Sequence, residues 1–166
     1  FGRKELAGLI KQAGFLSTEF LAPFPDYKLP VSIVTEHGFS CDAFDAAALA
    51  WQSVRRDPQL PPVLAFSPEL VWPTIVNNEL ALDLANSFLI VASQAESDIL
   101  VSSDILAWHF SCDRLAQYAK QAQFIRNDVG DIKVLYRRLS KEIDFWSGQK
   151  LFTFNLPTAE PYKHGE

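Results

Sequence analysis

The sequence contains no methionine, only two cysteines and no long run of apolar residues. Two cysteines are too few for a disulfide framework, so we expect Cys41 and Cys112 to be buried free thiols, with a single disulfide between them as the alternative. No apolar run approaches the roughly 20 residues that a membrane-spanning helix requires, and no signal peptide is visible. We therefore expect a cytoplasmic protein with no membrane span.

The absence of methionine also bears on where the chain begins. A natural full-length protein begins with methionine, so we expect this chain to be a piece of a longer protein. Its first residues are then expected to lie inside a domain that starts upstream of Phe1.

Composition and charge narrow the class of protein further. Of 166 residues, 48% are hydrophobic and 21% are charged, which is typical of a globular domain with a real core rather than a disordered chain. Thirteen phenylalanines and four tryptophans indicate a thick core or a sizeable interface. The net charge of −5 argues against non-specific binding to nucleic acid or to anionic membranes.

The segment Pro23–Glu36, PFPDYKLPVSIVTE, is the most informative part of the chain. Val31–Val34 is rich in β-branched residues and predicts a short buried strand, and Thr18–Ala22 predicts a second strand. Prolines stiffen the connection between them, because proline fixes φ and restricts the residue before it. Upstream, apolar residues at helical spacing predict a helix over Arg3–Gly14, with Gly14 as its C′ residue.

These segments also resemble a known family. GRKELAGLIKQAGF (residues 2–15) and FLAPFPDYKLPVSIVTE (residues 20–36) are similar to the last part of a class I AdoMet-dependent methyltransferase domain. The similarity is to methyltransferases of surface-polysaccharide (O-antigen or capsule) gene clusters, and Asn86–Val91 and Leu106–Leu139 fit the same relatives. The resemblance implies an α+β fold in which the last helix and strand pair of a Rossmann-like sheet precede a mixed α/β extension with a β-meander.

The resemblance also implies a division of the chain into three parts. Residues 1–38 would be the C-terminal end of the methyltransferase domain. Residues 39–98 would be a helical extension with a buried strand. Residues 99–166 would be an accessory region with a β-meander and a short helix.

The family's cofactor is S-adenosylmethionine, which needs a glycine-rich turn after the first strand and an acid for the ribose hydroxyls. No two of the seven glycines here are close enough to form such a turn. In the related proteins these elements would lie upstream of Phe1. We therefore expect the cofactor to bind the intact parent protein, and this chain to bind no cofactor and to be inactive alone.

Asp26, Tyr27 and Lys28 are the candidate substrate-binding residues. Ligands of open α/β sheets lie beyond the carboxyl ends of the parallel strands, and this loop would lie there if Thr18–Ala22 is the last parallel strand. Asp26 and Lys28 would then hydrogen-bond a sugar hydroxyl while Tyr27 stacks on the ring. The alternative is a solvated loop in which Asp26 pairs with Lys28 and Tyr27 packs.

The middle of the chain alternates between helical and strand-like patterns. Asp42–Arg56 predicts a helix capped by Ser40 or Asp42. Val63–Phe66 is either a short strand or a loop. A second helix is expected to begin at Pro68 or Pro73 and to run toward Asn78 or Leu84. Ser87–Ala92 is an apolar run typical of a strand covered on both faces.

The last third of the sequence is ambiguous between helices and strands. We predict three strands, Leu106–Phe110, Gln121–Arg126 and Ile132–Arg137, because Asn127–Gly130 has hairpin-turn chemistry. Apolar residues at helical spacing leave helices over residues 111–138 as the alternative. Beyond them we expect a helix over Ser140–Trp146, a strand over Leu151–Phe154 and a loop from Pro157.

No residue pattern in the chain indicates a metal site or a nucleophile. The three histidines, His37, His109 and His164, lack the spacing of metal ligands. His109 is expected to be a structurally satisfied histidine. No serine or cysteine lies in a nucleophile-elbow motif, so the catalytic residues stay unknown.

Two functions follow from the sequence. The first is the C-terminal part of a methyltransferase that acts on a glycan or nucleotide-sugar acceptor and supplies acceptor-side structure. The alternative is a non-catalytic interaction or dimerisation module. In either case we expect a homo-oligomer, because Thr18–Ala22 or Val31–Val34 would be an unprotected sheet edge.

Overall fold

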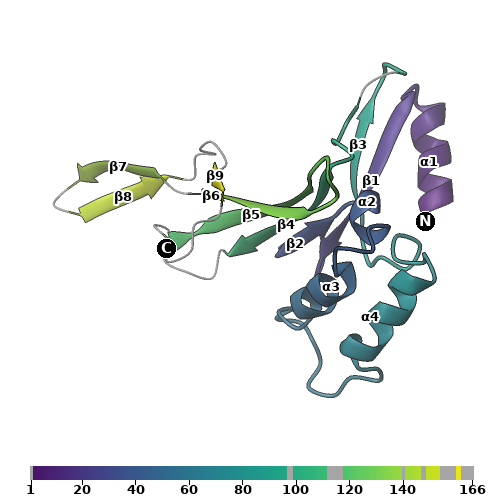
Figure 1. The fold of residues 1–166 in the computed structure, drawn as a ribbon, viewed down its shortest axis with the longest axis horizontal. Helices are drawn as coiled ribbons and strands as arrows, with labels where there is room; N and C mark the ends of the chain where they lie inside the picture. The colour runs from purple at the N-terminus through teal and green to yellow at the C-terminus, as the bar shows by residue number, and fades with distance from the viewer. Residues whose placement is uncertain are drawn as a thin grey trace.

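The structure is a computed structural model that describes residues 2–96, 99–111, 118–139, 141–146, 149–153 and 160–161, the last three ranges by their backbone alone. The described chain is α+β and contains a seven-stranded sheet, a separate two-stranded sheet and four helices (Figure 1). Cys112, His164 and most of the tail from Pro157 lie outside the described residues.

The larger sheet has the strand order β3-β1-β2-β4-β5-β6-β9, and each pair of neighbours is antiparallel. The strands that form it are β1 (Ser17–Phe24), β2 (Ser32–Val34), β3 (Leu89–Ser93), β4 (Ile105–Ser111), β5 (Lys120–Arg126), β6 (Ile132–Arg138) and β9 (Glu160–Pro161). The smaller sheet pairs β7 (Lys141–Trp146) with β8 (Gln149–Thr153). Strands from all three predicted segments of the chain therefore meet in one sheet.

Local chemistry explains where the four described helices begin and end. They are α1 (Arg3–Gln12), α2 (Glu36–Phe39), α3 (Ala46–Val54) and α4 (Pro68–Asn77). The Thr35 and Asp45 side chains accept backbone N–H bonds at the starts of α2 and α3, and Pro68 is the first residue of α4. Gly14, at φ 94°, ends the turn after α1 in a conformation that favours glycine.

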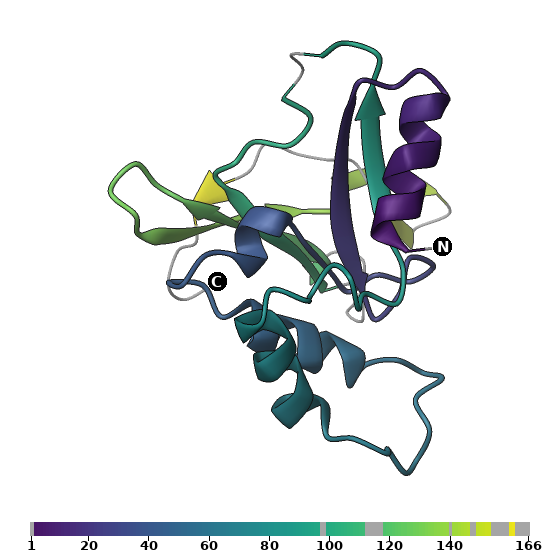
Figure 2. The same ribbon diagram turned by 90° about the vertical axis from the view of Figure 1, so that its right-hand side faces the viewer.

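The core lies between the helices and one face of the sheet. Figures 1 and 2 show α1 alongside β1, with α3 and α4 packed together. Small residues of α3 allow close approach, since Ala46 and Ala50 are almost completely buried. The buried residues that form this core are Phe20, Ala22, Phe24, Val34, Ala46, Ala50, Leu82 and Ala107.

Much of the local sequence reading is confirmed. The helix over Arg3–Gly14, the strands β1 and β2 and the helix within Asp42–Arg56 are present. The meander is also confirmed: β4, β5 and β6 are joined in order, and Gly130 occupies a positive-φ position in the turn between the last two. The cap of α3 is Asp45, however, instead of Ser40 or Asp42. The open choice at Val63–Phe66 resolves to a loop.

Three expectations about the strands and the C-terminal helix were wrong. Thr18–Ala22 was expected to be the last parallel strand, but β1 pairs antiparallel with both of its neighbours. The parallel setting of a Rossmann-like sheet is therefore not found there. The strand expected over Ser87–Ala92 lies at the sheet edge, so its residues are half-buried or exposed instead of covered on both faces. Ser140–Trp146 was expected to be helical, yet Lys141–Trp146 is a strand, and Ile143 and Phe145 alternate there with acidic residues at the period of two that strands require.

Candidate functional site

The predicted loop of Asp26, Tyr27 and Lys28 joins β1 to β2. The Asp26 carboxylate accepts the backbone N–H of Lys28 at 2.7 Å, which is a local turn bond. Tyr27 is 60% exposed, and the Lys28 ammonium lies 5.7 Å from the centre of its ring. The Tyr27 N–H donates to the Ser87 hydroxyl at 3.0 Å and so ties the loop to the segment before β3.

This geometry fits neither sequence reading completely. Tyr27 is presented to solvent instead of packing, while Asp26 is occupied by the backbone of its own turn. The supposition that placed the loop beyond a parallel strand is wrong, because β1 is antiparallel to both neighbours. Substrate binding by these three residues therefore stays a prediction.

A buried chain of polar side chains lies nearby, where β2 begins. Ser32 of β2 and His109 of β4 are register partners, and Ser32 Oγ lies 2.8 Å from His109 Nδ1. Ser53 of α3 completes the chain, with its Oγ 2.8 Å from Ser32 Oγ and 2.7 Å from the Leu49 carbonyl oxygen. Ser32 and Ser53 are 0% and 1% exposed, so both hydroxyls are buried.

Counting protons leaves two arrangements of these three contacts, because each serine hydroxyl has one proton and the Leu49 carbonyl can only accept. If Ser53 donates to Leu49, Ser32 donates to Ser53 and His109 donates from Nδ1. If Ser53 donates to Ser32, Ser32 donates to His109 Nδ1 and the proton of the neutral ring lies on Nε2. The second arrangement gives the Nε2 edge of His109 an N–H donor.

The polar chain borders a cavity of about 360 Å³ between α3 and β4, which we call the α3–β4 cavity. Its lining residues are Leu49, Trp51, Gln52, Ser53, Arg55, Arg56 and His109. This volume lies within the usual range for small-molecule sites, about 300–1,000 Å³. His109 thus lines this cavity while its Nδ1 is turned to Ser32.

Two arginines and one histidine line the α3–β4 cavity, although the chain carries a net charge of −5. Arg55 pairs with Glu69 of α4, with its Nε 2.8 Å from Oε1. The Ser67 hydroxyl and the Glu69 backbone N–H lower the pKa of Glu69, and Arg55 lowers it further. Glu69 is thus ionised at neutral pH and offsets the charge of Arg55.

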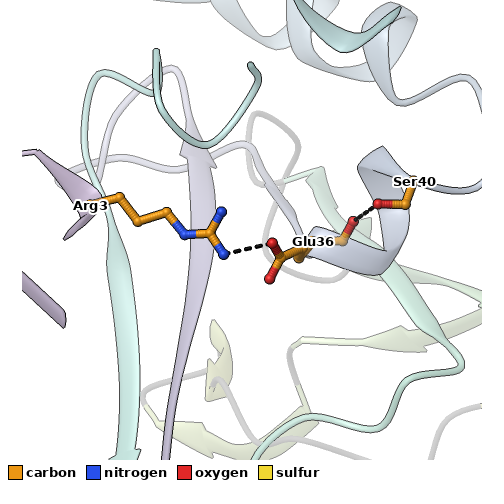
Figure 3. A network of polar contacts seen from close by, with 3 residues as sticks. All are labelled: Arg3, Glu36 and Ser40. Carbon is orange, nitrogen blue, oxygen red and sulfur yellow. Dashed lines mark hydrogen bonds and ion pairs between the residues drawn. The ribbon is translucent and has the colours of Figure 1, made fainter. Parts of the chain in front are cut away.

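Two other hollows lie beside α2. One, of about 310 Å³, is crossed by an ion pair in which Arg3 of α1 contacts Glu36 at 2.6 Å, and Ser40 donates back to the Glu36 carbonyl (Figure 3). The other, of about 700 Å³, contains Asp45, whose carboxylate caps α3, and the buried Cys41, which is a free cysteine as expected.

The described residues offer no group of three or more histidine, cysteine, aspartate or glutamate side chains that would hold a metal ion. Among the helices that the structure describes, none has the length and apolar character to cross a membrane. Nothing in these residues assigns a cofactor.

The sequence reading missed the members of the polar chain. Ser32 and His109 are 77 residues apart, and Ser53 is 21 residues from Ser32, so no motif spacing connects them. One signal was available, because Ser53 follows Ala46 and Ala50 on the buried stripe of α3, where a polar residue is unusual. His109, expected to be structurally satisfied, does have a partner at Nδ1.

Comparison with known proteins was negative: no family model, no curated protein and no solved structure gives a significant match to this chain. The methyltransferase resemblance therefore stays a prediction, and any function inferred from the structure depends on the cavity itself.

Proposed function

We propose that the chain is a binding module that takes a small anionic ligand in the α3–β4 cavity. The observation that carries this proposal is the Ser53–Ser32–His109 chain, which fixes the orientation of His109 at a cavity lined by Arg55 and Arg56. Guanidinium groups form charge-assisted, often bidentate bonds with phosphate and carboxylate.

The polar chain has a cost that packing alone does not explain. Burying hydroxyl and imidazole groups between a helix and a sheet is unfavourable unless every group is paired, and apolar residues would fill the same space without that cost. Ser32 lies two residues from Val34, which fills its own buried position on β2 with an apolar side chain. A fixed imidazole at the cavity is the benefit that the polar arrangement provides.

The proposal connects with the acceptor that the sequence resemblance implies. Nucleotide sugars carry phosphate groups, so they belong to the class of ligand that this rim suits, and Trp51 provides an aromatic surface in the same cavity. Action on a glycan precursor as part of an AdoMet-dependent methyltransferase remains part of the proposal. The antiparallel neighbours of β1 give no support to its Rossmann-like part.

Isothermal titration calorimetry with inorganic phosphate and with a nucleoside diphosphate tests the proposal. The Arg56→Ala and His109→Gln variants should each bind the diphosphate about 10- to 100-fold more weakly, because each loses one hydrogen bond donated to the anion, by the Arg56 guanidinium or by Nε2–H of His109, of roughly 1.5–3 kcal/mol. Arg126→Ala is the matched control: it removes the same charge from the exposed end of β5, outside the cavity lining, and should leave affinity unchanged.

Two results would contradict the proposal. One is a wild-type chain that binds neither probe at millimolar concentration. The other is an equal loss of affinity in the Arg126→Ala control, because binding would then depend on overall charge instead of on the cavity.

A further inference from the structure

The two edges of the larger sheet differ in how they are protected. One edge ends in β9, which has two residues, one of them proline. Very short strands and proline are devices that prevent edge-to-edge association. The opposite edge is β3, with five residues, LIVAS, that include no charge and no proline, and its register with β1 has no bulge. The β3 edge therefore lacks the usual protection.

The partner of β3 lies on one side of the strand. In the part of the chain that the structure describes, β3 pairs with β1 and with no other strand. Alternate residues of an antiparallel edge strand direct their N–H and C=O groups away from the sheet, where they form a template for another strand. Leu89, the first residue of β3, is 43% exposed, so a second strand could cover its side chain.

We propose that β3 pairs antiparallel with β3 of a second copy of this chain, so that two sheets become one across a two-fold axis at Val91. A two-fold axis at this residue places Ile90 opposite Ala92 and Leu89 opposite Ser93, with Val91 opposite its own copy. Each large side chain thus meets a small one, and the two β-branched valines meet at the centre.

The residue pairs also fall on consistent faces of the joined sheet. Ile90 and Ala92 share the face of their β1 partners Phe20 and Thr18, which is the face that the helices cover. Leu89, Val91 and Ser93 lie on the other face. Extending the sheet therefore continues both faces without exposing an apolar residue that was buried before.

The β3 edge carries no charge that would attract a charged partner. The edge itself is neutral, so it has no charge complementarity that would select a basic or acidic peptide. Two copies that each carry −5 repel one another at long range, and salt screens that repulsion. The dimer should therefore become tighter as ionic strength rises, which is opposite to the behaviour of an interface held by ion pairs. The homo-oligomer expected from the sequence stays a prediction. The strands expected to form its contact edge were wrong, because β1 and β2 are interior strands.

Sedimentation velocity over a concentration series, together with a charge-swap pair, tests the proposal. Val91→Lys and Val91→Glu each place two like charges opposite one another, so each variant alone should dissociate at least about tenfold more readily. An equimolar mixture should dimerise again, because the ammonium introduced in one copy would then face the carboxylate introduced in the other. Val129→Lys is the control, since Val129 is 85% exposed in the β5–β6 turn, and it should dimerise like the wild type.

Each outcome supports or overturns the proposal. A wild-type chain that stays monomeric at high concentration and high salt would overturn it, and so would a Val91→Lys variant that keeps the wild-type affinity. If the Val91 variants do not fold by circular dichroism, Leu89→Lys at the more exposed end of β3 replaces them, and it must weaken the dimer for the proposal to stand. None of these results depends on anion binding in the α3–β4 cavity.

Discussion

The two ends of β2 face the same layer of helices and are built in opposite ways. At Val34 and Thr35 the packing is tight: α2 lies directly on β4, Thr35 is 2% exposed, and its hydroxyl lies 2.8 Å and 3.0 Å from the carbonyl oxygens of Ile105 and Leu106. At Ser32 the contact with α3 passes through hydroxyl groups and ends at an imidazole beside a cavity.

The comparison of these two ends distinguishes polar groups that stabilise the fold from polar groups that orient a functional side chain. The Thr35 hydroxyl accepts the Gly38 N–H at 2.9 Å and contacts backbone carbonyls, so its polar partners are all main-chain groups of the fold. The Ser32 hydroxyl contacts two other side chains, and the last of them, His109, lines a cavity of small-molecule size. The first arrangement holds α2 in place, while the second orients a titratable group. Substitutions at each end should reflect this contrast.

The largest effect is expected for Gly38→Ala. A Cβ at this position would overlap the carbonyl oxygen of Leu106 and lie 3.0 Å from the Val34 side chain, so α2 would have to move off β4. We expect a loss of about 3 kcal/mol or more in the free energy of unfolding, the upper end of overpacking effects, measured by urea denaturation.

Gly8→Ala is the matched control for that experiment. An added Cβ at Gly8 meets no atom within 4 Å, and the residue lies inside α1. Alanine should therefore stabilise the protein by about 0.5–1 kcal/mol, as in other helix interiors. If both alanine variants unfold at the same urea concentration as the wild type, this result would contradict the close contact between α2 and β4.

Thr35→Val tests the polar part of the same end. Valine keeps the shape of threonine but removes the α2 cap and leaves the Gly38 N–H without its side-chain acceptor. The expected loss is about 2 kcal/mol, from an N-cap and a buried hydrogen bond together. A variant as stable as the wild type would show that main-chain contacts alone hold α2.

Ser32→Ala and Ser53→Ala separate the links of the polar chain at the other end. Ser32 is the middle link, so its loss removes the side-chain partner of both His109 Nδ1 and the Ser53 hydroxyl and should cost about 1–3 kcal/mol. Loss of Ser53 should cost only about 1 kcal/mol, because the Ser32 hydroxyl keeps its contact with His109 Nδ1.

The tautomer of His109 provides a direct readout of the proton arrangement in the polar chain. Nitrogen-15 NMR of the imidazole should show the Nε2–H form in the wild type at a pH where the ring is neutral, because that form can donate to an anion while Ser32 donates to Nδ1. The same form should remain in Ser53→Ala. An Nδ1–H tautomer in the wild type would leave Nε2 with a lone pair and contradict the proposed function.

The smallest effect on stability is expected for Tyr27→Ala. Tyr27 is largely exposed, and the substitution removes the contact between its ring and Lys28. The free energy of unfolding should therefore change by less than about 0.5 kcal/mol. Binding is the informative measurement here. A drop in nucleotide-sugar affinity without a change in stability would support the substrate role predicted for the loop, whereas unchanged affinity would leave Tyr27 outside the site.

Features that depend only on neighbouring residues could be predicted from the sequence. The Asn127–Gly130 turn is an example: the Asn127 side chain accepts the N–H groups of Val129 and Asp131, and Gly130 supplies the positive φ, so all of its chemistry lies within five consecutive residues. The end of α1 at Gly14 and the start of α4 at Pro68 are local in the same sense. Hydrophobic period and turn chemistry were sufficient for these features.

Long-range packing, in contrast, fixes which strands are neighbours and which side chains meet. The pattern of β1 is the same whether its neighbours run parallel or antiparallel, because side-chain alternation carries no information about direction. The edge position of β3 depends on pairing with residues far earlier in the chain, such as Ser17, which pairs with Ser93. The candidate site was hidden for the same reason: Ser32, Ser53 and His109 belong to three different elements, and only the folded chain brings a helix and two strands close enough for their polar groups to bond.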